Sequence, residues 1–244
     1  MKIIRRTIRD LARYCGVEIS RYLPNEMGRN PFSDMQRFLT DCEKPVIFDV
    51  GANVGQSVSL LKGAFPSSCV HSFEPSPTTF QILSNNCRDV PSFHAWNYGV
   101  GSQNTTLSFL ESERSDMSSF LAPSKFAGCN VEKVTDVPVI TLDAFSEKNQ
   151  VDYIHVLKSD TQGFDFEVFK GASRLMQENK IRLIYFEFIF SDMYKGLPKF
   201  HDVFCYLSEN NFDLVSFYEP HFQGDLVGWT DALLVNRKFR ENRS

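Results

Sequence analysis

Apolar and polar positions follow two different periods along most of the chain after Pro45. Short apolar runs of strand length alternate with longer stretches in which apolar residues recur every three or four positions. These patterns predict strands at 46–50, 69–73, 93–100, 153–158, 183–188, 212–217 and 232–235, and helices at 56–65, 77–87, 164–176 and 198–210. Strands that alternate with helices predict an α/β fold, with a mostly parallel sheet covered by helices on both faces.

Two stretches depart from this alternation. Between residues 101 and 145, short alternating segments at 105–109 and 137–141 enclose a loop, which indicates a small β-arm inserted into the domain. Before residue 40, the apolar residues Ile3, Ile4, Ile8 and Leu11 share one face of a helix with basic neighbours. We therefore expect a helical extension at 1–40 and one domain at 41–244, with weak contact between the basic helix and a membrane surface as an alternative to packing.

Composition narrows the classes of protein that fit the pattern. A chain of 244 residues that is 42% hydrophobic is typical of one globular domain. The net charge of -4 argues against a nucleic-acid partner, which usually requires a basic surface. Six scattered cysteines, no secretion signal and no apolar run of membrane-spanning length predict a cytoplasmic protein without a transmembrane span. The oligomeric state does not follow from the sequence.

A glycine turn carries the clearest functional signal. Asp49 lies at the end of the first predicted strand, and Gly51 and Gly55 follow it and precede a helix. Glycine lets a ligand approach the bare backbone of such a turn. Glu74 ends the next strand and follows Gly55 by 19 residues, close to the spacing of about 20 at which nucleotide-binding βαβ units place a carboxylate for ribose hydroxyls. The pattern predicts a nucleoside-containing cofactor.

The acid in this turn selects among such cofactors. Dinucleotide sites favour G-x-G-x-x-G, whereas Asn53 stands here in place of the middle glycine and Asp49 precedes the turn. A carboxylate repels a pyrophosphate but attracts an ammonium group, which favours S-adenosylmethionine. A dinucleotide, or glycines that serve only the turn, are the alternatives. The residues expected to contact the cofactor are Asp49, Gly51, Ala52, Asn53, Gly55, Gln56, Ser57, Glu74, Pro75, Asn97, Tyr98 and Asp160.

With these segments in order, the chain resembles the FkbM family of S-adenosylmethionine-dependent methyltransferases. The segments that carry the resemblance are FDVGANVGQS at 48–57, SFEPSPTTF at 72–80, TLDAF at 141–145, LKSDTQGFDFEVFKG at 157–171 and IYFEF at 184–188. The resemblance implies a Rossmann-like fold with a seven-stranded sheet whose last strand is antiparallel. It also implies O-methylation, often of sugars in glycans or in glycosylated metabolites.

Candidates for catalysis lie where strands end, because ligands of open α/β sheets bind beyond the carboxyl ends of the strands. Asp160 comes just after one such strand, and Glu187 lies at the end of the next. Either can accept the proton of an attacking hydroxyl or hold that hydroxyl in place. Asp160 can instead hold the cofactor ammonium. Lys158 shares a face with Asp160 as a catalytic partner or as an ion pair only. His221, in a late loop, is a further candidate base.

Other roles and other functions stay open at this point. Asp160, Glu187 and Asp192 offer the oxygens that a divalent cation prefers, but no two histidines stand at metal-ligand spacing, so we expect no metal. The acceptor is expected to be a small molecule or a glycan of unspecified identity. The alternative functions are a non-catalytic S-adenosylmethionine-binding protein of a biosynthetic complex and a nucleotide-cofactor oxidoreductase.

Overall fold

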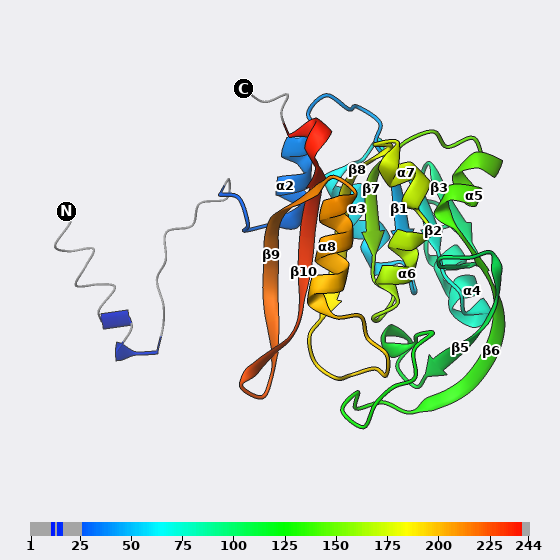
Figure 1. The fold of residues 1–244 in the computed structure, drawn as a ribbon, viewed down its shortest axis with the longest axis vertical. Helices are drawn as coiled ribbons and strands as arrows, with labels where there is room; N and C mark the ends of the chain where they lie inside the picture. Colours follow the sequence, from blue (N-terminus) through cyan, green and yellow to red (C-terminus); the bar gives the residue numbers. More distant parts are fainter. Residues whose placement is uncertain (1–10, 13, 17–25, 241–244) are drawn as a thin grey trace.

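The computed structural model describes residues 11–12, 14–16 and 26–240. Its centre is a seven-stranded sheet of order β3-β2-β1-β7-β8-β10-β9 (Figure 1). The strands are β1 (Val46–Val50), β2 (Cys69–Phe73), β3 (Phe93–Trp96), β7 (Ile154–Ser159), β8 (Ile181–Ile189), β9 (Phe212–Gln223) and β10 (Leu226–Asn236). The first five pair in parallel, and β10 is antiparallel to both of its neighbours. The predicted Rossmann-like methyltransferase fold is confirmed.

Helices cover both faces of this sheet. The helices are α2 (Pro31–Phe38), α3 (Gln56–Ala64) and α4 (Pro77–Asn86) on one side, and α5 (Leu142–Lys148), α6 (Asp165–Lys170), α7 (Ser173–Gln177) and α8 (Phe200–Glu209) on the other. Successive strand residues point to opposite faces. In β1, Ile47 therefore packs with Leu61 of α3, whereas Phe48 packs against Phe145 of α5. Two covered faces explain the nearly continuous apolar runs in the sequence.

The predicted β-arm is a second, three-stranded sheet. It consists of β4 (Gly99–Val100), β5 (Thr105–Ser112) and β6 (Val131–Ile140), with the short helix η1 (Ser115–Met117) after β5. The Ser76 hydroxyl donates to Glu111 at 2.6 Å, and the Ser119 hydroxyl donates to the Gln162 carbonyl at 2.9 Å. The insert, which we define as residues 101–141, is thus attached to the turns after β2 and β7. In Figure 1 it lies at the same lower end as the tip of the β9–β10 hairpin.

The predicted strand at 93–100 is wrong in its second half. The chain leaves the main sheet after Trp96, and Gly99 and Val100 pair instead with β6 of the insert. The Asn97 amide donates to the carbonyls of Glu74 and Pro75, at 2.8 and 3.0 Å. These two bonds hold the chain to the turn after β2, so the strand ends there.

The predicted helix at 164–176 is two helices, α6 and α7. Gly171 separates them, and a Cβ on Gly171 would lie 2.1 Å from the Gly101 carbonyl oxygen, so only glycine fits. The Asp143 carboxylate accepts the backbone N–H groups of Arg174 and Leu175, at 2.9 and 3.0 Å. Asp143 therefore caps the start of α7 and fixes the break.

Helix α2 is an element that the sequence reasoning missed. The Asn30 side chain caps it by accepting the Ser33 N–H at 2.9 Å, and Pro31 follows at the first helical position. Met35 packs into the same core as β1, so residues 31–38 are part of the domain's packing. The amphipathic helix predicted at 3–11 lies almost wholly outside the described residues, and its contact with a membrane surface stays a prediction. No helix of the described residues combines the length and apolarity that crossing a bilayer requires.

Candidate active site

A cavity of about 640 Å³ opens at the carboxyl ends of β1, β2, β7 and β8. Its volume is within the range of small-molecule sites. The predicted residues that line it are Gly51, Ala52, Asn53, Gln56, Ser57, Glu74, Pro75, Tyr98, Lys158, Asp160 and Glu187. Asp49, Gly55, Asn97 and His221 are not among its lining residues. The insert and the β9–β10 hairpin also reach it, through Met117 and Trp229.

Glu74 is fixed by backbone groups on both sides. Its two carboxyl oxygens accept the N–H of Asn53 at 3.0 Å and the N–H of Ser76 at 2.9 Å. Burial raises the pKa of Glu74 to about 7, and these two hydrogen bonds oppose that rise. Each carboxylate oxygen has a further lone pair, so Glu74 can still accept hydroxyl groups of a ligand. The site therefore fits a ribose at this position.

Asp49 lies behind the cavity wall and is 0% exposed. One of its oxygens accepts the hydroxyls of Ser57 and Ser72, at 2.7 and 3.1 Å. The other oxygen is 3.1 Å from the Lys158 ammonium. Direct contact between Asp49 and a cofactor stays a prediction, since its contacts in the structure are to the residues that shape the cavity.

Lys158 is a buried cation between two carboxylates. Its ammonium lies 3.1 Å from Asp49, 3.6 Å from Asp160 and 3.4 Å from the Gly51 carbonyl. Burial lowers the pKa of Lys158, but the charges of Asp49 and Asp160 outweigh burial, so the pKa is raised. Lys158 therefore stays protonated and provides positive charge rather than a base.

Asp160 and Glu187 converge on one side chain, the amide of Gln162. This amide donates to Asp160 Oδ1 at 3.0 Å and to Glu187 Oε1 at 3.2 Å. Asp231 of β10 lies opposite Glu187 in the sheet. Burial, followed by the charges of Asp160 and Asp231, raises the pKa of Glu187 to about 9. The two carboxyl groups therefore lie on either side of one amide, and their catalytic role stays a prediction.

Two members of this arrangement were missed by the sequence reasoning. Gln162 stands two residues after Asp160, and its place in the same segment was the available signal. Tyr194 donates its hydroxyl to Gln162 Oε1 at 3.0 Å, and no sequence pattern marks it. His221, the candidate base, is exposed, and its ring stacks on Trp229 with centroids 5.1 Å apart. Its role also stays a prediction.

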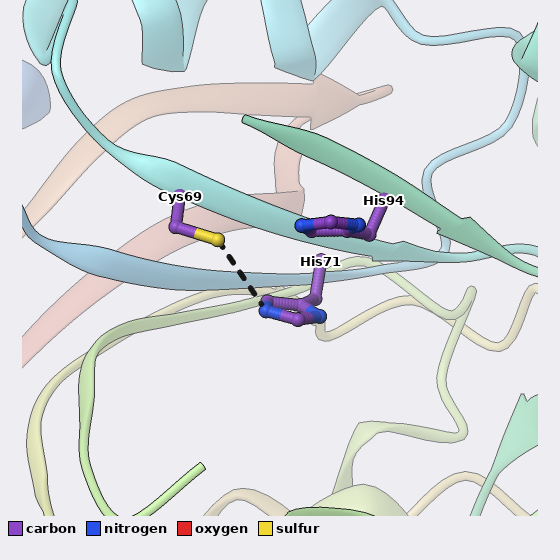
Figure 2. Close-up of side chains that lie close together, drawn as sticks. All are labelled: Cys69, His71 and His94. Carbon is purple, nitrogen blue, oxygen red and sulfur yellow. Dashed lines mark hydrogen bonds between the residues drawn. The ribbon is translucent and has the colours of Figure 1, made fainter. Parts of the chain in front are cut away.

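Strands β2 and β3 bring together a group that sequence spacing did not reveal. Ligand atoms of Cys69, His71 and His94 lie within 4.8 Å of one another (Figure 2). The two imidazole planes are only 27° apart, so their in-plane lone pairs do not converge on one ion. Trp96 donates to His71 Nδ1 at 3.3 Å, which leaves the proton on Nε2, 3.5 Å from the Cys69 sulfur. The geometry is that of a neutral histidine between a donor and a thiol.

The strand order, the glycine turn after β1 and the carboxylate after β2 together define a Rossmann-like methyltransferase fold. The methyltransferase FkbM domain matches residues 49–214. The chain belongs to this family.

Curated relatives match part of the chain. It is 28% identical over 141 residues to the hexuronic acid methyltransferase AglP of Haloferax volcanii, covering 55% of this chain and 53% of that protein. It is 25% identical over 142 residues to Methyltransferase 1 of Beauveria bassiana, covering 51% and 57%. The chain thus spans about half the length of the curated relatives that it matches. A solved rRNA methylase from Streptococcus thermophilus is 11% identical with a TM-score of 0.48, over 86% of this chain and 99% of that one. That likeness adds nothing to the topology above.

Proposed function

We propose that this chain is an S-adenosylmethionine-dependent O-methyltransferase that acts on a hydroxyl of a sugar, a glycan or a glycosylated metabolite. One observation carries the proposal. Asp160 and Glu187 line the same cavity as Glu74 and the bare backbone at Gly51. Groups able to receive a hydroxyl proton therefore share one cavity with a site suited to a nucleoside.

The cofactor end of the cavity offers three kinds of contact. Glu74 accepts the ribose hydroxyls, Tyr98 flanks the adenine, and the backbone from Gly51 to Asn53 lies against the ligand. Asp160 provides negative charge for the cationic part of the cofactor. When bound, S-adenosylmethionine supplies an electrophilic methyl group on a sulfonium.

The acceptor end provides a proton acceptor. Of the four carboxyl oxygens of Asp160 and Glu187, Glu187 Oε2 alone has no partner among the described residues. We assign it the acceptor hydroxyl, whose oxygen forms the new bond to the methyl carbon while its proton moves to the carboxylate. The nearby positive charge of a bound cofactor lowers the pKa of Glu187, which favours the carboxylate form that catalysis requires. Lys158 stays cationic and stabilises Asp160.

Aromatic side chains favour a sugar over a smaller alcohol. Phe126, Phe222 and Trp229 line the cavity, and Phe222 is 62% exposed. Aromatic faces pack against the C–H faces of a sugar ring, while carboxylates accept its hydroxyls. A relative described as a hexuronic acid methyltransferase supports a sugar acceptor of this general class.

Charge and cysteine chemistry support two narrower expectations. The net charge of -4 does not favour a polyanion, so we propose no nucleic-acid partner. All six cysteines are free thiols, which fits a reducing compartment. We therefore propose a cytoplasmic location.

Calorimetry and a transfer assay test the function. Purified protein should bind S-adenosylhomocysteine and should not bind NAD, and no binding of S-adenosylhomocysteine contradicts the cofactor proposal. Radiolabelled methyl transfer from S-adenosylmethionine is then measured with a panel of neutral hexose and hexuronic acid glycosides. Transfer to at least one of them supports the proposal. Binding without transfer to any glycoside favours the non-catalytic cofactor-binding alternative.

A further inference from the structure

The amide of Gln162 is shared between two acidic groups that would otherwise repel each other. Its nitrogen lies 3.0 Å from Asp160 Oδ1 and 3.2 Å from Glu187 Oε1. A primary amide carries two N–H donors, so one can point to each carboxyl group. Neighbouring carboxylates disfavour each other's charge, and a hydrogen bond to the charged form offsets this effect. Gln162 thus stabilises both ionised groups from one neutral side chain.

Tyr194 fixes which way this amide faces. Its hydroxyl lies 3.0 Å from Gln162 Oε1 and 3.0 Å from the Met117 carbonyl of η1. Both of these oxygens are acceptors and the hydroxyl has one proton, so it donates to one of them at a time or shares the proton between them. Tyr194 is only 3% exposed, so its partners are not replaced by bulk water. If the amide turned over, Gln162 Oε1 would face Asp160 and Glu187, and both of the N–H donors that now reach these carboxyl groups would be lost. The tyrosine hydroxyl therefore favours the orientation that serves Asp160 and Glu187.

The insert also holds the backbone of Gln162. Gln162 has a φ of 53°, in the left-handed region that non-glycine residues seldom adopt. The hydroxyl of Ser119, a residue of the insert that is 1% exposed, donates to the Gln162 carbonyl at 2.9 Å. A strained backbone of this kind persists where its surroundings determine it, and it clusters at functional sites. The insert thus contacts Gln162 directly through Ser119 and indirectly through Met117 and Tyr194.

We infer that Gln162 and Tyr194 are positioning residues, which hold Asp160 and Glu187 in fixed relation and connect them to the insert through Met117. The inference rests on the proposed function, because it assumes that the two carboxyl groups face the sulfonium of the cofactor. It predicts that loss of either positioning side chain changes the ionisation of Glu187 and leaves the ribose end of the cavity unchanged.

The charged groups around Glu187 determine the pH at which it ionises, and this pH can be measured. Asp160 faces it from the turn after β7, with Lys158 beside Asp160. Asp165 faces it from the start of α6, Asp231 from β10 with Tyr185 bonded to it, and Tyr194 from the segment after β8. Without the donors of Gln162, repulsion within this group increases and Glu187 ionises at a higher pH. S-adenosylmethionine has one more positive charge than S-adenosylhomocysteine. Its advantage in affinity over S-adenosylhomocysteine should therefore grow as Glu187 ionises.

The test compares the affinities of S-adenosylmethionine and S-adenosylhomocysteine by calorimetry from about pH 6.5 to about pH 10.5, a range that includes the raised pKa of Glu187, about 9, and the expected shift. For the wild-type protein, the ratio should rise with pH. In Gln162→Met, which keeps the length of the side chain and removes its donors, the midpoint should move up by about one pH unit. Tyr194→Phe should move it in the same direction by roughly half as much, because the amide remains but is no longer held. Affinity for S-adenosylhomocysteine at pH 7 should stay within about twofold.

Tyr218→Phe is the matched control. The Tyr218 hydroxyl donates to Asp34 of α2 at 2.8 Å on the other side of the sheet, so this variant loses one buried tyrosine hydrogen bond without touching the carboxyl pair. Its midpoint should equal that of the wild type. If the midpoint of the affinity ratio in Gln162→Met equals that of the wild type, the inference is wrong. This outcome decides the matter even if Tyr194→Phe does not fold. Failure of the wild-type protein to bind S-adenosylhomocysteine instead overturns the proposed function itself.

Discussion

The proposed cofactor end and the proposed acceptor end of the cavity are built from different kinds of contact. At the cofactor end, Glu74 is held by the backbone N–H groups of Asn53 and Ser76. At the acceptor end, the carboxyl groups are held by the side chain of Gln162, which is itself held by the side chain of Tyr194. One end therefore depends on the path of the main chain, and the other depends on the identity of each side chain.

This difference predicts how each end of the cavity responds to amino-acid substitution. A turn fixed by main-chain bonds keeps its shape when neighbouring side chains vary, so cofactor binding should tolerate substitution well. A network of side chains loses its arrangement when one member is removed. Substitutions at the acceptor end should therefore affect turnover strongly while affinity for S-adenosylhomocysteine changes little, and the predictions below test this division.

The largest expected effect is on methyl transfer at the acceptor end. Asp160→Asn and Glu187→Gln should each lower turnover by about 10²–10⁴-fold with the glycoside identified by the transfer assay, since a general base typically contributes that much. Turnover of the wild type should rise with pH as Glu187 loses its proton, because the pKa of Glu187 is raised to about 9 by burial and by Asp160.

Affinity for S-adenosylhomocysteine is the control for both variants, and it should change little. If Asp160→Asn mainly abolishes cofactor binding, its role is to hold the cofactor ammonium, and His221 becomes the next candidate base. Wild-type turnover and KM in both variants would show that neither carboxyl group acts on the acceptor.

The next largest effect is on the stability of the fold, and it concerns Lys158, which lies between the two ends of the cavity. Lys158→Met leaves Asp49, which is 0% exposed, with no cation beside it. Breaking a buried ion pair in this way costs about 3–5 kcal/mol, measurable by denaturant unfolding. Lys148→Met, an exposed lysine of α5, should change the free energy of unfolding by no more than about 0.5 kcal/mol. If Lys158→Met changes the free energy of unfolding no more than this control, the Lys158–Asp49 ion pair does not stabilise the fold. The double variant Asp49→Asn with Lys158→Met should recover part of the lost stability, because it removes the unpaired charge.

The sequence indicated the turn after β1 and Glu74 better than the contacts of Gln162, for a physical reason. The turn after β1 and Glu74 lie within one βαβ unit, whose spacing is set by strand and helix lengths. The contact between Tyr194 and Gln162 depends on how the insert packs against the segment after β8, and no local pattern encodes it. The same limit applies to the two helices α6 and α7, because the contact of Gly171 with Gly101 joins residues far apart in the sequence.

A smaller effect is expected at the cofactor end. Glu74→Ala should weaken binding of S-adenosylhomocysteine by about 1–3 kcal/mol through lost hydrogen bonds to the ribose. Since burial raises the pKa of Glu74 to about 7, wild-type affinity should fall as the pH drops below 7, where the carboxylate becomes protonated and accepts fewer hydrogen bonds. Calorimetry of Glu74→Gln should show little dependence on pH over the same range. Equal binding by the wild type and Glu74→Ala would remove Glu74 from the site.

The smallest expected effect is that of metal removal. A divalent cation at the acceptor end would need carboxyl oxygens of Asp160 and Glu187. Three of these four oxygens already face a donor or a cation, because Gln162 donates to one oxygen of each group and Lys158 lies 3.6 Å from the other oxygen of Asp160. A cation would have to displace these donors and approach the Lys158 ammonium, which repels it.

Methyl transfer should therefore survive extensive dialysis against EDTA, with the rate unchanged when Mg²⁺ or Mn²⁺ is added back. The exposed Asp192, proposed from the sequence as a third ligand, provides the control, because Asp192→Asn should have no effect on the rate. Loss of activity that Mg²⁺ or Mn²⁺ restores would make Asp160 and Glu187 metal ligands. The acceptor end would then be organised by an ion, and the division between main-chain and side-chain construction would have to be replaced.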